Sequence, residues 1–324
     1  MIAIFIQALL ASVILFFIAL KILRGKSKRW GGAVLIAVFI GMVLLHRELE
    51  LTTQLKGILT GSLLILAFGF WDDYKNLSWK VQAIFQILLV TVLVYSGFSV
   101  DYFAGLNGDE IRIDRLILQG ISMGSIAFIF LWVTGIINAI NWADGVDSSM
   151  GSIAVIGGLS LIFVSFLPEV NQPAIAILAS IFLGGLVGFL IFNLPPARVE
   201  AGTSGSYFVG FILASLAIIA GSKIITVMIV LVLPLVDFIW VIIGRWKNKK
   251  SIFKKDKRHL HHRLKKIGWS DRRIFLSYFI FLGSVLIIYS LLENRIERVL
   301  LIAVETILVL AIFSKISITL KNKH

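Results

Sequence analysis

Four polar side chains recur at intervals of three residues between two long apolar segments of this 324-residue chain. Asn138, Asn141, Asp144 and Asp147 form the series, with Gly145 between the two carboxylates. On a helix this spacing places side chains at neighbouring positions of one face, and the glycine could end that helix. Polar groups at membrane depth usually face a protein interior or a water-filled cavity and mark functional sites. A solvated loop with a helix cap is the alternative interpretation.

Two adjacent carboxylates, Asp72 and Asp73, end another apolar segment abruptly. Hard cations such as Mg2+ take oxygen ligands, keep several waters and are often shared with substrate phosphates. One of the two aspartates could instead act as a general base. The alternative is an interfacial pair that only stops the segment. Lys80 and Gln86, which follow on what looks like one helical face, argue against that alternative.

A basic segment with three histidines is the third candidate. It reads Asp256-Lys257-Arg258-His259-Leu260-His261-His262-Arg263. Three histidines so close together would suggest zinc elsewhere, but the adjacent His261 and His262 point apart on a helix. Imidazoles among lysines and arginines suit a phosphate better than a metal cation. Basic loops are also often only orientation signals for a membrane protein.

Small residues from Gly202 to Ser206 form a fourth segment, where backbone N–H groups at a helix start can bind an anion. Together the four segments offer carboxylates for Mg2+, amides, a helix start and a basic cluster. This combination predicts phosphoryl transfer between a soluble phosphate donor and a lipid-borne acceptor. Catalysis would rest on positioning and on charge neutralisation by the metal.

Apolar segments long enough to cross a bilayer must position these residues. The chain is 58% hydrophobic and 15% charged, with a mean hydropathy of +0.96, which excludes an ordinary soluble domain. Its net charge of +13 indicates cytoplasmic loops, anionic lipid or a phosphorylated substrate, and not nucleic acid. There are no cysteines, so disulfides and thiolate chemistry are excluded. We interpret the N-terminal apolar run as a retained first span.

We expect an all-α, polytopic membrane protein with about eleven transmembrane helices in a single domain over residues 1–324. The approximate spans are 2–20, 31–45, 57–71, 81–97, 121–140, 151–167, 174–192, 206–220, 223–244, 274–292 and 299–316. The acidic loop 101–115 carries a turn signal, Asn107-Gly108. An odd number of spans places the termini on opposite sides, and the basic loops after the first and ninth spans predict an outside N-terminus and a cytoplasmic C-terminus. Loops near 72–80, 138–150, 193–206 and 245–273 then share the cytoplasmic face.

The order and spacing of these motifs resemble the polyprenyl-phosphate N-acetylhexosamine-1-phosphate transferases, the family of the MraY and WecA enzymes. The segments that carry the resemblance are Gly69-Phe-Trp-Asp72-Asp73 with Leu77, Lys80 and Gln86; Asn138-x-x-Asn141-x-x-Asp144-Gly-x-Asp147; Pro234-x-x-Asp237; and Asp256 to Leu264. The last segment is closer to the WecA-like branch, because MraY enzymes have three consecutive histidines.

The resemblance implies an enzyme that moves a HexNAc-1-phosphate, GlcNAc-1-phosphate first among them, from a UDP-HexNAc donor to undecaprenyl phosphate and releases UMP. It implies Mg2+ as cofactor, with Mn2+ as an alternative, a place in the plasma membrane and a role in cell-envelope glycan synthesis. A homodimer is left open. The implied catalytic residues are Asp72, Asp73, Asp144 and His261, and the implied metal ligands are Asp72, Asp73, Asp144 and Asp147. The implied substrate-binding residues are Lys80, Asn138, Asn141, Asp147, Arg258, His259, His262 and Arg263.

Three positions depart from the pattern of that family. Thr203 stands where a metal-binding aspartate is expected, Glu200 where an aromatic residue is expected, and Ser148 where a glycine is expected. Either the metal depends on the remaining aspartates, or Glu200 reaches into the site, or activity is reduced. A transporter or flippase for an anionic solute and a catalytically impaired scaffold are the competing hypotheses. Glu305, in the middle of the last span, fits none of these interpretations.

Overall fold

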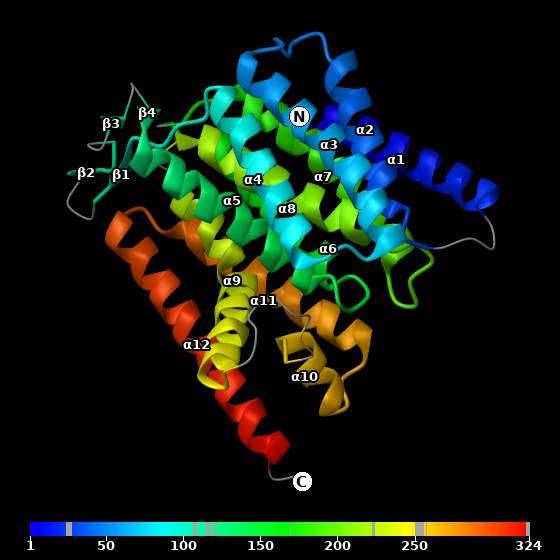
Figure 1. Ribbon diagram of the computed structural model, residues 1–324, viewed down its shortest axis with the longest axis vertical. Coiled ribbons are helices and arrows are strands. Elements are labelled where there is room, and N and C mark those ends of the chain that lie inside the picture. Colours follow the sequence, from blue (N-terminus) through cyan, green and yellow to red (C-terminus); the bar gives the residue numbers. More distant parts are fainter. Residues whose placement is uncertain are drawn as a thin grey trace.

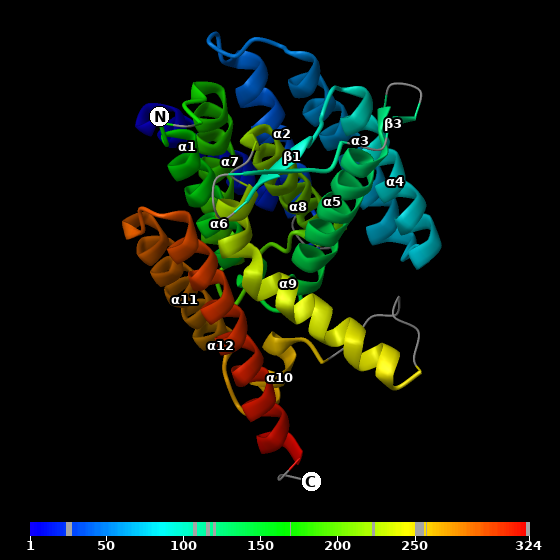
Figure 2. The same cartoon turned by 90° about the vertical axis from the view of Figure 1, so that its left-hand side faces the viewer.

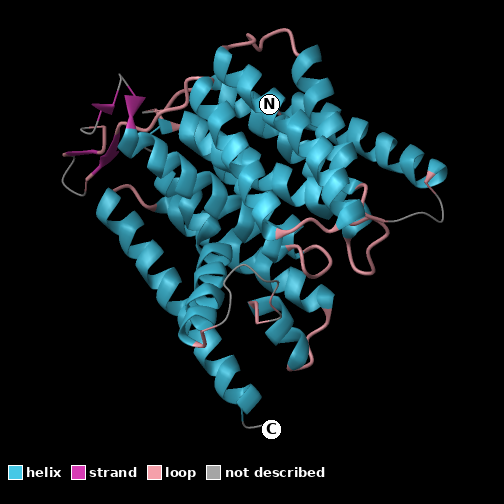
Figure 3. Cartoon of the chain, viewed as in Figure 1, coloured by secondary structure: helices cyan, strands magenta, loops and turns pink. Residues whose placement is uncertain are grey.

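The computed structural model describes residues 1–23, 28–105, 109–114, 117–118, 121–168, 170–221, 224–249, 256 and 258–321. Its helices are α1 (Ile2–Ile22), α2 (Gly31–Leu45), α3 (Thr53–Lys75), α4 (Trp79–Tyr95), α5 (Met123–Ala143), α6 (Ser149–Ser165), α7 (Pro173–Asn193), α8 (Gly202–Ile219), α9 (Ile224–Lys247), α10 (Leu260–Lys266), α11 (Asp271–Leu291) and α12 (Arg295–Lys321). Figures 1 and 3 show these helices as one bundle. Among the described residues, eight helices are long and apolar enough to cross a membrane and three more are shorter and apolar. These eleven helices match the predicted spans one for one, so the prediction of an all-α polytopic membrane protein is confirmed.

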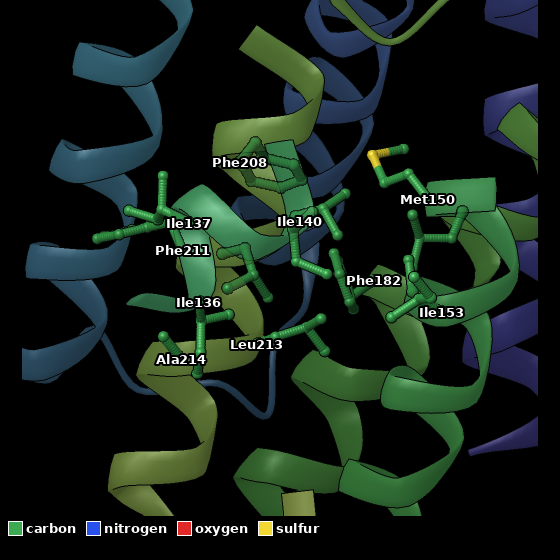
Figure 4. Packing of buried hydrophobic residues seen from close by; sticks show 14 of the residues in the cluster. Ile136, Ile137, Ile140, Met150, Ile153, Phe182, Phe208, Phe211, Leu213 and Ala214 are labelled. Atoms are coloured by element: carbon green, nitrogen blue, oxygen red, sulfur yellow. The ribbon is translucent and has the colours of Figure 1, made fainter. Parts of the chain in front are cut away.

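Helix α8 lies at the centre of the bundle and contacts α2, α3, α5 and α6. It is apolar on all sides, as expected of a helix with no solvent-facing surface, and Phe208 and Phe211 are at most 1% exposed. Figure 4 shows both rings among Ile137 and Ile140 of α5 and Phe182 of α7. In contrast, α1 packs mainly along α7 and α2, and most of its length faces outward. The central helix therefore sets the positions of the helices around it.

Two glycines allow the start of α8 to approach its neighbours closely. A Cβ atom at Gly32 of α2 would overlap the backbone of Gly205, and one at Gly69 of α3 would overlap the backbone of Ser204. Any larger residue at either place would push α8 away. Because Gly69 stands one turn before the Asp72–Asp73 pair, this contact brings the two carboxylates to the N-terminus of α8.

Short strands that the sequence did not predict occupy the connection between α4 and α5. Strand β1 (Tyr102–Ala104) pairs antiparallel with β2 (Glu110–Arg112), and β3 (Ile117–Leu118) with β4 (Ile121–Ser122). The predicted turn residues Asn107 and Gly108 lie outside the described residues. Figure 1 shows these hairpins at the opposite end of α5 from the Asn138–Asp147 stretch.

The helix ends that carry the predicted polar segments share one end of the bundle. The C-terminus of α3 meets the N-terminus of α8, and the loop after α5 meets the loop after α7. Helix α10 and the C-terminal part of α12 also lie at this end, as Figures 1 and 2 show. Which side of the membrane this end faces stays a prediction.

Glu305 on α12 is the unexplained carboxyl group of the last span. It is 1% exposed, and neither of its oxygens has a hydrogen-bond partner among the described residues. Its burial therefore destabilises the fold.

Replacing Glu305 with leucine should raise the Tm of the detergent-solubilised protein by about 3 °C or more, because an unsatisfied buried polar group costs about 1–3 kcal/mol. The matched control is Glu297→Leu, which removes an exposed carboxylate from the first turn of the same helix and should give no such gain. A Tm that falls in the Glu305 variant would show that this carboxyl group has a stabilising partner.

Candidate active site

A cavity of about 550 Å3 opens where these helix ends meet. Its walls come from the ends of α3 and α5, the start of α8, the segment before α10 and the residues just before α2. The lining residues are Arg29, Asp72, Asp73, Gln82, Asn141, Trp142, Asp144, Gly145, Val146, Asp147, Asn193, Glu200, Gly202, Thr203, Asp256, His259 and His262. All four polar segments that the sequence singled out therefore contribute to one cavity.

Asp72 is held by uncharged donors on both of its oxygens. Oδ1 accepts the N–H of Leu77 and the side-chain amide of Gln82, each over 3.0 Å, and Oδ2 accepts the hydroxyl of Thr203 over 2.6 Å. The residue is only 6% exposed. This carboxylate is therefore oriented and largely satisfied within the protein.

Asp73 caps helix α8 from a neighbouring helix. The residue at the N-cap position of α8 is Ala201, which has no side-chain acceptor. Instead both carboxylate oxygens of Asp73 accept the N–H of Thr203 over 3.1 Å. A negative charge at a helix N-terminus is stabilised by the orphan N–H groups and the helix dipole. The predicted anion-binding helix start is thus occupied by a carboxylate of the protein itself.

The two asparagines on α5 build the wall behind the cavity. Asn138 exchanges hydrogen bonds with Gln86 of α4, over 2.9 and 3.2 Å, and does not line the cavity. Asn141 does line it, and its Oδ1 accepts the hydroxyl of Ser206 over 2.8 Å. These amides fix α4, α5 and α8 relative to one another.

The described residues provide no hydrogen bond to the side chain of Asp144, a carboxylate that lines the cavity. It stands at the C-cap of α5. Burial, followed by the charges of Glu200 and Asp73, raises the pKa of this carboxyl well above its ordinary value. A divalent cation at this place would reverse that shift, since it favours the ionised form.

Asp147 and Ser148 join the loop after α5 to the loop after α7. Oδ2 of Asp147 accepts the N–H of Ala197 over 2.9 Å. Ser148 adopts a φ of +64°, where glycine is usual, and Asn193 holds it there. The N–H of Ser148 donates to Asn193 Oδ1 over 2.9 Å, and its hydroxyl donates to the Asn193 carbonyl over 2.8 Å. The serine in place of the expected glycine is thereby accommodated.

Arg29 is a cavity residue that the sequence analysis missed. Backbone hydrogen bonds between residues 28–32 and 200–201 bring it there: Glu200 N–H donates to the Lys28 carbonyl, and Gly31 N–H donates to the Glu200 carbonyl. Arg29 Nε lies 3.6 Å from Glu200 Oε2, and both side chains are about half exposed. Glu200 therefore does reach the cavity, paired with a cation.

The basic segment contributes Asp256, His259 and His262 to the lining of the cavity. Asp256 forms ion pairs with Arg245 and Arg258 at 2.6 and 2.7 Å. Although burial alone would raise the pKa of Asp256, hydrogen bonds from these two arginines hold it well below the ordinary value. Hydrogen bonding to Asp256 also raises the pKa of Arg258. Asp256 thus fixes two arginines close to the cavity. Neither Arg245 nor Arg258 is part of the cavity lining.

His259 and His262 line the cavity, whereas His261 is buried behind it. The His259 ring packs against Trp142, and its Nδ1 lies 3.3 Å from Asp237 Oδ2. Burial, and then the neighbouring His262 and His259, lower the pKa of His261 well below its ordinary value. The buried His261 ring packs closely against Gly145, in the loop after α5.

Other predicted residues lie away from the cavity. Lys80 is exposed at the start of α4, beside Trp79, while Gln86 is buried, so the prediction that Lys80 and Gln86 share a helical face is wrong. Arg263 donates to the Arg258 carbonyl and to Ser317 of α12. Lys257 lies outside the described residues.

Comparison with known proteins places the chain among membrane transferases. Residues 55–221, about half of the chain, match the family described as Glycosyl transferase family 4. The chain belongs to this family. A probable undecaprenyl-phosphate N-acetylglucosaminyl 1-phosphate transferase of Bacillus subtilis is 32% identical over 276 residues, which cover 81% of this chain and 73% of the relative.

Two further relatives are also named as transferases. The decaprenyl-phosphate N-acetylglucosaminephosphotransferase of Mycobacterium leprae is 30% identical over 291 residues, covering 80% of this chain and 71% of the relative. The phospho-N-acetylmuramoyl-pentapeptide-transferase of Latilactobacillus sakei is 30% identical over 237 residues, covering 69% of this chain and 72% of the relative. The family resemblance inferred from the motifs is thereby confirmed.

The donor set of the cavity fits Mg2+ only as a shared ion. Among the described residues, no group of three or more histidines and carboxylates is placed to hold a metal alone. However, Mg2+ is commonly bound by one or two carboxylates, with waters and substrate phosphates completing the octahedron. Asp144, which faces the cavity without a protein donor among the described residues, fits this pattern best.

Proposed function

We propose that this protein transfers a sugar-1-phosphate, GlcNAc-1-phosphate in the first instance, from a UDP-sugar to a polyprenyl phosphate. The observation that carries the proposal is one cavity at a helix-end surface whose lining combines several carboxylates with an arginine and two histidines. The names of the relatives support the lipid phosphate acceptor and the GlcNAc-phosphate group. The enzyme acts in the plasma membrane with the cavity on the cytoplasmic side, where UDP-sugars are made.

In this reaction an oxygen of the lipid phosphate attacks the β-phosphorus of the UDP-sugar. The bond between the β-phosphorus and the bridging oxygen breaks, and UMP leaves with that oxygen. A phosphate monoester has a second pKa of about 6, so the acceptor is mostly deprotonated at neutral pH and needs no base. This agrees with the environment of Asp72, whose oxygens already accept hydrogen bonds.

The chain's own residues position the two substrates. Arg29, His259 and His262 face the cavity and bind the diphosphate by charge and hydrogen bonds. Asp144, with Asp73 nearby, would hold Mg2+, which would supply charge neutralisation for the transferred phosphoryl group. Asn141 and Asp147 contact the nucleotide or its ribose from the end of α5.

Release of UMP by the purified protein tests the proposal. The assay combines UDP-GlcNAc, undecaprenyl phosphate and Mg2+, with each component omitted in turn, and repeats the series with UDP-GalNAc. We expect UMP only when lipid and Mg2+ are both present. If no UDP-HexNAc donor gives lipid-dependent UMP, the protein is not this enzyme, and a scaffold with altered positions 200 and 203 becomes the better explanation.

Asp237 on α9 should fix the position of His259, which lines the cavity. Its Oδ1 accepts the N–H of Leu260 over 3.1 Å, at the start of α10, and its Oδ2 lies beside His259 Nδ1. Asp237→Ala removes both interactions, and we expect kcat/KM for the UDP-sugar to fall by about 100-fold, as for a misplaced substrate-binding group.

Asp237→Asn is the matched variant, because its amide oxygen can still accept from Leu260 while the charge beside His259 is lost. Its kcat/KM should lie between those of the wild type and the alanine variant. Equal kcat/KM values in all three proteins would exclude a role for Asp237 in positioning His259.

A further inference from the structure

Thr203, the residue that departs most from the family pattern, contacts both carboxylates of the Asp72–Asp73 pair. Its hydroxyl donates to Asp72 Oδ2 over 2.6 Å, and its N–H donates to both oxygens of Asp73. We propose that Thr203 is a positioning residue which holds the carboxylate pair against the start of α8 without a metal ion. The proposal deepens the function proposed above, and its activity test rests on that function.

The hydrogen bonds to the pair found among the described residues all come from uncharged donors. Asp72 receives a backbone N–H from Leu77, an amide N–H from Gln82 and the hydroxyl of Thr203. Asp73 receives the N-terminal N–H of α8, where the helix dipole adds to the stabilisation. Buried or half-buried carboxylates that accept several hydrogen bonds keep a fixed orientation. The pair is therefore set in place by the fold before substrate or metal arrives.

A carboxylate at position 203 would behave in the opposite way. The present contact joins two oxygens at 2.6 Å, and two ionised carboxylates at that separation repel unless a proton or a cation lies between them. The junction of α3 and α8 would then depend on a divalent cation. With threonine, a hydrogen bond from an uncharged hydroxyl replaces that dependence, and Mg2+ would be needed for the substrate phosphates alone.

Thermal unfolding of the detergent-solubilised protein tests the proposal without any turnover. The wild type, Thr203→Ser, Thr203→Val and Thr203→Asp are compared in MgCl2 and in a monovalent salt of matched ionic strength. We expect Mg2+ to raise the Tm of the aspartate variant by at least about 3 °C more than that of the wild type. The valine variant should have a lower Tm than the serine variant under both conditions, because Asp72 loses a donor.

Thr91→Val is the matched control, because the Thr91 hydroxyl donates only to a carbonyl of its own helix on an exposed face. It should change neither the Tm nor the response to Mg2+. If the aspartate variant does not fold at all, the difference in Tm between the serine and valine variants still tests the role of the Thr203 hydroxyl.

Steady-state kinetics of the same variants provide a second test of the proposal. We expect Thr203→Val to lower kcat about tenfold with little change in KM for the UDP-sugar, since a misoriented carboxylate affects the reacting geometry. Thr203→Ser should recover most of that loss. Equal Mg2+ responses of the wild type and the aspartate variant, or equal Tm and kcat for serine and valine, would overturn the proposal. An inactive wild type with the predicted unfolding pattern would instead reject the proposed function and leave the role of Thr203 standing.

Discussion

Replacing Asp144 with asparagine should lower kcat by about 1000-fold, the largest effect that we expect from any single carboxylate. Asp144 faces the cavity without a hydrogen bond from the described residues, so its oxygens are available to a cation that is shared with the donor phosphates. Losing one preorganised electrostatic contact to a transition state typically costs a factor of 100 to about 1000. Initial rates of UMP release measure the effect.

The matched control for Asp144 is Asp101→Asn, which removes an exposed carboxylate at the opposite end of the bundle. Its kcat should equal that of the wild type. A kcat for Asp144→Asn within tenfold of the wild type would mean that this carboxylate binds neither cation nor substrate.

The pH profile gives an independent check on Asp144. Burial and the charges of Glu200 and Asp73 raise its pKa, and the ionised form, present above that pKa, is the one that binds a cation. Activity should therefore fall as the pH drops through the raised pKa, and more Mg2+ should move this acidic limb to lower pH because proton and cation compete. An acidic limb that does not respond to Mg2+ would contradict the assignment.

Gly202→Ala should have the second-largest effect, with kcat about 100-fold lower and a reduced Tm. Gly202 has a φ of +68°, and an added Cβ would lie 2.5 Å from Asp73 Oδ2 and 3.1 Å from the Arg29 carbonyl. The substitution therefore strains the backbone and also displaces a carboxylate and an arginine of the cavity. A displacement of about 1 Å can cost a factor of 100 in rate.

Gly97→Ala separates these two contributions. Gly97 has a φ of +80°, but an added Cβ there meets no atom within 4 Å. It should lower the Tm through backbone strain and leave kcat unchanged. If the two variants lose activity to the same degree, the close contact of position 202 with Asp73 does not explain the loss of kcat in Gly202→Ala.

The sequence was sufficient to predict the spanning helices, because long apolar runs have few other stable structures in a bilayer. It was not sufficient for the hairpins between α4 and α5, where strands of two or three residues are too short to show an alternation. Helix α10, only seven residues long, is likewise defined by its tertiary contacts, such as the bond from Leu260 to Asp237.

The site could be predicted where spacing or adjacency carried the signal. The Asp72–Asp73 pair and the Asn141 and Asp144 positions do meet in one cavity. Arg29 was missed because backbone pairing with residues 200–201, which are remote in sequence, brings it to the cavity. Lys80 was misplaced because it is six residues from Gln86, which on a helix is about 240° of rotation.

Gln82, one turn before Gln86, shares its face and is the residue that contacts Asp72. A stricter use of helical periodicity could have found it. By contrast, the partners of Thr203 depend on close approach of α8 to α3 at Gly69, which no local pattern reveals.

The most direct test of the central claim follows the β-phosphate of the donor. Protein in proteoliposomes that contain undecaprenyl phosphate receives UDP-GlcNAc labelled with 32P at the β-position, with Asp144→Asn as the inactive control. Sugar-1-phosphate transfer predicts that the label moves to the organic phase as a lipid diphosphate, with an equal amount of unlabelled UMP in the aqueous phase. Label that stays in water as UDP while the sugar reaches the lipid would show transfer of the sugar alone and would contradict the account.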